Sequence, residues 1–329
     1  MRVLALVLVG TSLLAADQQF FELKALKLAS GATVSSCRVG YRTFGTLNEA
    51  KSNAVVFPTW FSGKSADLDQ FFGPDKLVDT SKYFGVAIDA LGNGVSCSPS
   101  NVPGGLPAIG IADMVGAEHR LLTEGLGLKS VYAVVGISIG GMQTFEWIAR
   151  YPNFMRKAVP IIGSPKLTTA DLLLWQAELS AIESAAACHG DLRSAMFAVQ
   201  AMHRFALRTP DYWATSPEAA NWATVKAGLK TEAAETIDPL DWAAQLRAMM
   251  SQDVAANAGG SMQRAAANVR ARTLVVIATQ DHMVNPGPAL RFADWANANV
   301  LKLTGNCGHM ATGCESAKMT PSVRAFLAQ

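Results

Sequence analysis

The chain has 329 residues, of which half are hydrophobic and 16% are charged, and its formal net charge is +2. A chain of this size and composition can bury one large α/β domain, or one domain that carries a sizeable insertion. No basic cluster is present, so nucleic acid is not an expected partner. Neither a Gly-x-x-x-x-Gly-Lys-Ser/Thr phosphate loop nor a His-Glu-x-x-His helix occurs, and no metal or other cofactor is expected.

Residues 1–16 differ from the rest of the chain. Arg2 precedes an apolar run that extends from Val3 to about Ala16, and a polar segment follows it. One cation, a short apolar stretch and small residues near its end are typical of a secretory signal peptide. The run is too short to predict a stable membrane span. We therefore expect a secreted or periplasmic protein; the alternative is that the run forms a buried first strand.

Strand-like runs alternate with helical stretches through most of the remaining chain. A helix is expected at residues 111–126, and another directly after residue 138. Strands that alternate with helices indicate a mostly parallel sheet covered on both faces, which is an α/β fold. The expected strands are residues 20–28, 35–43, 54–57, 83–88, 131–135, 158–162, 273–278 and 300–303.

The pattern changes between residues 162 and 273, where four helical stretches follow one another without a strand. Tryptophan and methionine are concentrated there, and lids of this kind close on apolar substrates. We expect a helical lid over residues 166–265, inserted into a core made of residues 17–165 and 266–329. For most of these tryptophans and methionines, ordinary packing between helices is the expected role. The expected helices are residues 172–187, 192–207, 219–229 and 240–250.

Gly136-Ile-Ser138-Ile-Gly140 joins the apolar run 131–135 to a helical pattern. A Gly-x-Ser-x-Gly motif between a buried strand and a helix places the serine on a sharp, strained turn, with its hydroxyl exposed above the sheet. The two glycines remove side chains that would collide at this turn. Ser138 is therefore the predicted nucleophile. The amide of Ile139, at the helix N-terminus, is the first predicted donor of an oxyanion hole.

A serine nucleophile of this kind needs an acid and a histidine, which follow it in chain order. Asp281 comes just after the strand at 273–278, where a carboxylate can accept the imidazole N–H and fix the tautomer. His309 follows the last strand in a glycine-containing loop that can carry its ring back to the serine. We predict Asp281 and His309 as the partners of Ser138, with Asp89 and Asp113 as the alternative acids.

The second oxyanion donor is expected in the loop at residues 58–63, after the third core strand. The backbone N–H of Phe61 is the predicted donor, and that of Trp60 is the alternative. A backbone N–H suits this role because its position is fixed before negative charge develops on the substrate oxygen.

The chain resembles the homoserine O-acetyltransferase family of proteins with the α/β-hydrolase fold. The resemblance implies an α/β-hydrolase core, a helical lid, a triad of Ser138, Asp281 and His309, and a homodimer formed through the lids. The most specific part is the serine segment with its Gly-Gly-Met-Gln continuation. The segments that carry the resemblance are residues 40–56, 79–84, 91–94, 111–115 and 136–147.

The chain departs from this family where the amino-acid acceptor binds. Met310 follows the catalytic histidine where the family carries aspartate, and Lys166 stands where the family carries arginine. The loop at residues 58–63, which we call the oxyanion loop, contains the bulky Trp60, where the family shows smaller residues. Losing a carboxylate and a bidentate arginine weakens the recognition of a zwitterionic amino acid. A secreted enzyme would also lack acetyl-CoA.

These departures favour water as the acyl acceptor, so the leading hypothesis is a secreted serine esterase acting on a small-molecule ester. Trp60, Lys166 and Met310 are the predicted substrate-binding residues. An O-acyltransferase of the homoserine O-acetyltransferase type, with acetyl-CoA as donor, is the nearest alternative. A catalytically inactive binding protein is a third, which the presence of all three triad residues in order disfavours.

Five cysteines with irregular spacing do not form the pattern of a disulfide framework. Cys307 and Cys314 are the exception, because they lie on either side of His309 and a short glycine-containing segment joins them. We predict a disulfide between them that braces the His309 loop, with two unpaired thiols as the alternative. Cys37, Cys97 and Cys188 are expected to be unpaired.

Overall fold

The computed structural model describes residues 16–188 and 190–329. The predicted signal peptide lies outside these residues, apart from Ala16. Within them, no helix is both long enough and apolar enough to cross a membrane.

The predicted mostly parallel sheet is confirmed: eight strands pair in the order β1-β4-β6-β5-β7-β8-β9-β10. Only β4 runs against both of its neighbours. The expected strand at residues 20–28 is two strands, because β2 leaves the sheet and pairs with β3 as a separate hairpin. The bounds are β1 Gln19–Leu23, β2 Leu26–Lys27, β3 Thr33–Val34, β4 Cys37–Phe44, β5 Ala54–Pro58, β6 Phe84–Ile88, β7 Val131–Ile137, β8 Met155–Ile161, β9 Arg272–Ala278 and β10 Asn299–Leu303.

Helices cover both faces of this sheet, and the strands alternate their apolar side chains between the two layers. Val56 belongs to the core under α1, α2 and α9, whereas its neighbours Val55 and Phe57 belong to the core under η1 and α11. The expected helix at 111–126 is α1 followed by a π-helical turn, η2. The bounds are η1 Ser65–Phe71, α1 Ile111–Arg120, η2 Leu121–Gly125, α2 Ile139–Arg150, α9 Pro286–Trp295, η5 Gly308–Met310, α10 Ala311–Cys314 and α11 Ser316–Ala328.

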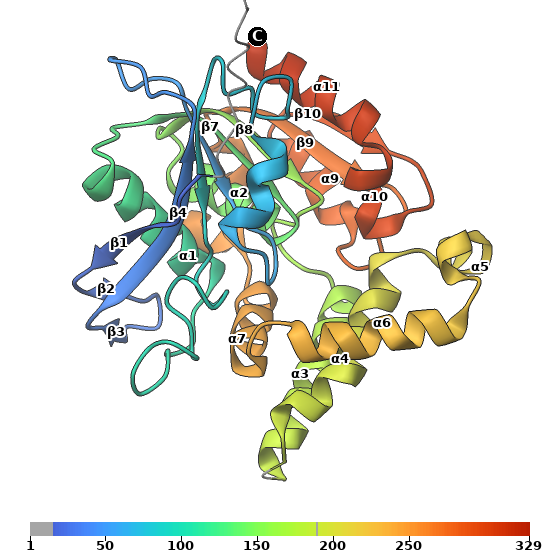
Figure 1. The fold of residues 1–329 in the computed structure, drawn as a ribbon. Coiled ribbons are helices and arrows are strands. Elements are labelled where there is room, and N and C mark those ends of the chain that lie inside the picture. Colours follow the sequence, from blue (N-terminus) through green and yellow to red (C-terminus); the bar gives the residue numbers. More distant parts are fainter. Residues whose placement is uncertain (1–15, 189) are drawn as a thin grey trace, which may run out of the picture.

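Between β8 and β9 the described chain forms helices and adds no strand to the sheet, as the sequence predicts. We call α3 to α8 the helical insertion; α3 to α6 extend away from the sheet at the lower right of Figure 1. The sequence missed the short helices α5 and α8, which are too brief to show a helical period. The bounds are α3 Thr169–Ala187, α4 Leu192–Leu207, α5 Pro210–Thr215, η3 Pro217–Ala219, α6 Trp222–Glu235, α7 Pro239–Met250, η4 Val254–Ala258 and α8 Met262–Ala267.

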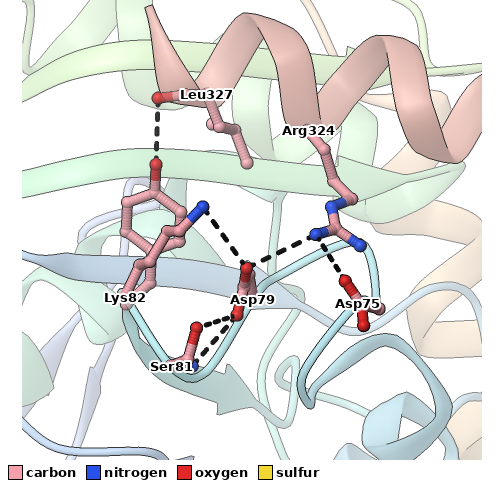
Figure 2. Close-up of polar contacts among 7 residues, drawn as sticks. Asp75, Asp79, Ser81, Lys82, Arg324 and Leu327 are labelled. Atoms are coloured by element: carbon pink, nitrogen blue, oxygen red, sulfur yellow. Dashed lines mark hydrogen bonds and ion pairs between the residues drawn. The ribbon is translucent and has the colours of Figure 1, made fainter.

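Polar contacts fix the last helix, α11, on the sheet. Figure 2 shows Arg324 between two carboxylates, with Nη2 at 3.0 Å from Asp75 Oδ1 and 3.4 Å from Asp79 Oδ2. At the end of α11, the buried Lys157 donates from Nζ to the carbonyl oxygen of Leu327 at 2.8 Å. A lysine suits the C-terminus of a helix, where carbonyl groups are unpaired and the dipole is negative. These contacts hold the end of the segment that begins with η5.

A buried carboxyl group lies between α1 and α2. Glu118 is buried, and its Oε2 accepts a hydrogen bond from Trp147 Nε1 at 2.7 Å. Burial raises the pKa of Glu118 from 4.5 to about 8, and the hydrogen bond from Trp147 only partly opposes this shift. The folded protein therefore keeps this carboxyl group protonated at pH values where the unfolded chain ionises it.

We predict that the free energy of unfolding contains a contribution from Glu118 that falls as pH rises from about 4.5 to about 8. The sign follows because the folded state binds the extra proton in this window. Glu118→Gln replaces the titrating carboxyl group by an amide. The free energy of unfolding of this variant, relative to that of wild type, should therefore increase with pH, by on the order of a few kcal/mol at pH 8. Urea unfolding at several pH values measures this difference. Glu124→Gln, at an exposed position, is the control, and a pH-independent difference for Glu118→Gln would contradict the prediction.

Two disulfides occur among the described cysteines. Cys307 and Cys314 are bonded, with Cα atoms 6.5 Å apart, which confirms the predicted pairing around His309. Cys37 and Cys97 are also bonded, with a Cα separation of 5.4 Å, so the expectation that these two are unpaired is wrong. They are 60 positions apart in the chain, and only the folding of β4 beside β6 brings them together. Cys188 is free and exposed.

We predict that replacing both Cys307 and Cys314 by serine lowers the free energy of unfolding by about 2–3 kcal/mol, because the bond closes only a short loop. Denaturant unfolding of the oxidised protein measures the loss. Cys188→Ser, which removes a free thiol, should leave the stability unchanged. Equal stability of the double variant and wild type would show that the bond does not constrain this loop.

Candidate active site

Ser138 lies on a strained turn between β7 and α2. Its backbone has φ 58° and ψ −118°, a conformation that a non-glycine residue rarely adopts. A Cβ atom at Gly136 would collide with the carbonyl of Gly140, and one at Gly140 would lie 2.6 Å from the carbonyl oxygen of Pro58. The two glycines are therefore needed for the close approach that the sequence predicts. The turn lies at the carboxyl end of β7, beside β5, where the strand order reverses and open α/β sheets bind ligands.

The structure brings the predicted partners together at this turn. His309 Nε2 is 2.9 Å from Ser138 Oγ, and His309 Nδ1 is 2.6 Å from Asp281 Oδ2. The other carboxylate oxygen, Asp281 Oδ1, accepts the backbone N–H groups of Met283 and Val284 at 2.9 and 3.0 Å. Because the carboxylate accepts from Nδ1, the neutral imidazole presents the lone pair of Nε2 to the serine hydroxyl. This is the geometry required for proton removal from Ser138.

The alternative acids have other partners. Asp89 accepts hydrogen bonds from Ser65 and Asn93 in the network behind the oxyanion loop. Asp113 caps the start of α1 by accepting the backbone N–H of Gly110 at 2.8 Å. Neither carboxylate is hydrogen-bonded to a histidine among the described residues, so Asp281 holds the position of the third triad member.

The two residues predicted to supply oxyanion donors are Ile139, which directly follows Ser138, and Phe61, in the loop after β5. Ile139 is the first residue of α2, so its N–H has no acceptor within the helix. Phe61 and Ser138 line the same cavity, and Phe61 belongs to the loop that follows β5. The backbone N–H groups of these two residues are the candidates for binding a developing negative charge.

Two glutamines that the sequence analysis missed hold this loop. Gln245, on α7, accepts the N–H of Ser62 at 2.7 Å through Oε1 and donates from Nε2 to the carbonyl of Leu91 at 3.2 Å. Gln143, on α2, donates to the carbonyl of Thr59 at 3.2 Å. Gln143 belongs to the Gly-Gly-Met-Gln segment and could have been singled out there. Gln245 lies 183 positions from Ser62, and no local pattern signals its contact.

A cavity of about 590 Å³ opens on Ser138 between the sheet and the helical insertion. Trp60 and Met310, two of the three predicted substrate-binding residues, line it. Trp175 and Met249 of the helical insertion also line it, so these two residues face the cavity as well as packing between helices. The cavity wall is mainly apolar, with aromatic, methionine and aliphatic side chains: Phe61, Phe71, Ile137, Ile162, Leu207 and Met283.

Lys166 is not part of this cavity, which corrects the prediction that it binds substrate. Its side chain is 57% exposed, and Nζ forms an ion pair with Asp253 Oδ2 at 2.6 Å. The prediction assigned to Lys166 the role of an arginine that the acetyltransferases carry at the corresponding position. Here the segment bends after β8, and the isolated backbone pairing of Lys166 with Asp253 turns the residue toward the surface.

A second histidine on the cavity wall was also missed. His203, on α4, lines the cavity, and its Nδ1 is 3.2 Å from Oε1 of the buried Glu178 on α3. The two residues are 25 positions apart on different helices, so no helical spacing pairs them in the sequence.

Comparisons with known proteins agree with this fold. Residues 55–312 match the family described as the alpha/beta hydrolase fold. A probable esterase from Corynebacterium glutamicum is 33% identical over 277 residues, which are 78% of this chain and 78% of that protein. The ethyl acetate hydrolase of Pseudomonas veronii is 31% identical over 324 residues, or 92% of each chain. Among solved structures, the acetyl esterase MekB superposes with a TM-score of 0.88 and 27% identity, covering 95% of this chain and 96% of that one.

Membership of the predicted homoserine O-acetyltransferase family is not confirmed by these comparisons. A homoserine O-acetyltransferase from Methanosalsum zhilinae is 37% identical, but only over 160 residues, which are 42% of this chain and 32% of that protein. The two relatives described above, which match over most of the chain, are named as an esterase and an ester hydrolase. The sheet order, the serine turn and the family match together establish the broader assignment: the chain belongs to the α/β hydrolase fold family.

Proposed function

We propose that the protein is a carboxylic-ester hydrolase with Ser138 as nucleophile, His309 as general base and acid, and Asp281 as the residue that orients the imidazole. The observation that carries the proposal is the pair of hydrogen bonds from Ser138 to His309 at 2.9 Å and from His309 to Asp281 at 2.6 Å. A ring held on one side by a buried carboxylate and on the other by a serine hydroxyl is the arrangement of a serine hydrolase. The names of the relatives support esters as substrates.

In the first half of the reaction, Ser138 Oγ attacks the ester carbonyl and its proton moves to His309 Nε2. Negative charge develops on the carbonyl oxygen, where the N–H groups of Phe61 and Ile139 bind it. The tetrahedral intermediate then collapses, the bond to the alcohol oxygen breaks, and His309 returns its proton to the departing alcohol. The acyl group remains on Ser138.

In the second half, water takes the place of the alcohol. His309 accepts a proton from water as the water oxygen attacks the acyl carbonyl, and the same two N–H groups bind the oxyanion. The intermediate releases the carboxylic acid, and the proton on His309 returns to Ser138 Oγ. Because α7 holds the oxyanion loop through Gln245, the helical insertion contributes to the geometry of both steps.

Water is the proposed acyl acceptor because the cavity lacks the two charged groups that the acetyltransferases use to hold an amino acid. Met310 replaces the carboxylate that acetyltransferases use, and Lys166 is paired with Asp253 outside the cavity. O-acyl transfer to an alcohol, through the same acyl-enzyme, is the second candidate, and the partial match to a homoserine O-acetyltransferase favours it.

We also propose that the protein is exported. The two disulfides support this, because such bonds persist in secreted and periplasmic proteins and are rare in reducing compartments. A homodimer through the helical insertion stays a prediction.

We predict that Ser138→Ala lowers kcat/KM for p-nitrophenyl acetate by several powers of ten while leaving the unfolding transition in place, because the variant lacks the attacking oxygen. Ser184→Ala, at an exposed position on α3, is the matched control and should retain wild-type activity. Turnover by Ser138→Ala within tenfold of wild type would rule out the proposed nucleophile.

We predict that the wild-type enzyme releases acetate from short acetyl esters without any coenzyme, and that homoserine does not divert the acetyl group. Products of a reaction with butyl acetate and excess homoserine, and of one with acetyl-CoA and homoserine, can be quantified by chromatography. Formation of O-acetylhomoserine faster than acetate would favour the transferase.

A further inference from the structure

A buried carboxylate holds His203 on the wall of the cavity, as Asp281 holds His309. His203 Nδ1 is 3.2 Å from Glu178 Oε1, and Trp242 Nε1 donates to Glu178 Oε2 at 3.1 Å. Glu178 is fully buried, and both of its oxygens have partners. The remaining ring nitrogen, His203 Nε2, has no hydrogen-bond partner among the described residues, although the ring lines the cavity. Ser138 is already bound to His309, so His203 is available for another role.

The charge of this pair determines what it can bind. Within the described part of the chain, His203 is the only basic side chain within ion-pair distance of Glu178. A carboxylate removed from water is costly unless a proton or a positive charge compensates it. The tautomer of the ring sets the role of Nε2, which donates when Nδ1 accepts from Glu178 and accepts when a neutral ring donates from Nδ1 to the carboxylate. A hydroxyl of a ligand can pair with Nε2 in either case, and an ether or carbonyl oxygen can pair with it when Nε2 carries the hydrogen.

A hydrogen-bond donor without a partner in the described part of the chain lies in the same wall. The indole nitrogen of Trp175 is buried and has no acceptor among the described residues, and its ring centroid is 5.9 Å from that of His203. Phe61 stacks near both rings, with centroids at 5.6 Å from His203 and 6.4 Å from Trp175. The indole of Trp175 and the imidazole of His203 therefore both lie near Phe61, which supplies one of the proposed oxyanion N–H groups. Buried N–H groups without an acceptor cost free energy that an oxygen atom of a ligand can recover.

We propose that Trp175, Glu178 and His203 form a polar subsite that binds a neutral oxygen of the substrate, separate from the reacting ester group. The inference rests on the proposed ester hydrolysis and narrows its substrate class to esters that carry a second oxygen, as an ether, hydroxyl or carbonyl. A carboxylate is disfavoured there because it would remove a further charged group from water beside the buried carboxyl group of Glu178. The surrounding wall, with Leu207 and Met249, accommodates the hydrocarbon part of such a molecule.

The test compares isosteric esters that differ only by an oxygen in place of a methylene group. On the alcohol side the pair is 2-methoxyethyl acetate and butyl acetate; on the acyl side it is p-nitrophenyl 3-methoxypropanoate and p-nitrophenyl pentanoate. Mono-p-nitrophenyl succinate supplies the carboxylate. For each pair, the ratio of kcat/KM is measured in wild type, in Trp175→Phe, and in the double variant His203→Phe with Glu178→Gln, which leaves no buried charge.

For each pair, the kcat/KM of the oxygen-containing ester is divided by that of its partner. The change in this ratio between wild type and a variant does not depend on the intrinsic reactivity of the two esters. We expect the wild-type preference for the oxygen-containing member of one pair to fall about tenfold in the double variant, which is the effect of one lost hydrogen bond. Trp175→Phe should also lower the preference for the oxygen-containing ester. His119→Phe, a substitution in an aromatic cluster outside the cavity, is the matched control and should keep the wild-type ratio.

Two results would overturn the subsite: ratios that are the same in wild type and in both variants for both pairs, or a wild-type preference for the succinate ester. Failure of the proposed hydrolysis would look different, because wild type would then cleave neither member of any pair. Binding of the two acetates to Ser138→Ala, followed by tryptophan fluorescence, tests the subsite without turnover. Tighter binding of 2-methoxyethyl acetate that the double substitution abolishes supports it, and equal binding overturns it.

Discussion

The strained backbone at Ser138 is the constraint on which the site depends. With φ at 58°, the residue departs from the preferred regions of an L-amino acid, and the turn persists because β7 and α2 are fixed on either side of it. The turn sets the hydroxyl above the carboxyl end of the sheet and starts α2 at once. The N–H of Ile139 is thereby free for a substrate oxygen. One local distortion thus positions both the proposed nucleophile and a proposed oxyanion donor.

The other parts of the site reach this turn from distant segments, and each is held by its own contacts. His309 lies between the two cysteines of a disulfide, and α11 beyond it is fixed by Lys157 and Arg324. The oxyanion loop is tied to α2 by Gln143 and to the helical insertion by Gln245. Preorganised donors and a held imidazole do not need to reorganise when charge develops, which is the main source of catalysis in such sites. The insertion therefore encloses the cavity and also supports the reacting groups.

The sequence predicted the parts of the site that depend on local pattern or on chain order. The glycines around Ser138, the acid after β9 and the histidine after β10 each follow from where a strand ends, and the structure brings all three residues together. Contacts between remote segments left no such signal. The Cys37–Cys97 disulfide, the Gln245 contact with Ser62 and the Glu178–His203 pair arise only from tertiary packing. Lys166 was misassigned because its role came from alignment with a family rather than from the bend that turns it to the surface.

The proposed function depends on Ser138 being a nucleophile that His309 activates. Diethyl p-nitrophenyl phosphate transfers its phosphoryl group to such serines and forms a stable adduct. Intact-mass measurement of the treated protein, followed by peptide mapping, tests the claim most directly. We expect one diethylphosphoryl group per chain, located on Ser138, and much slower labelling of His309→Ala. An unmodified protein, or an adduct on another residue with Ser138 unchanged, would contradict it.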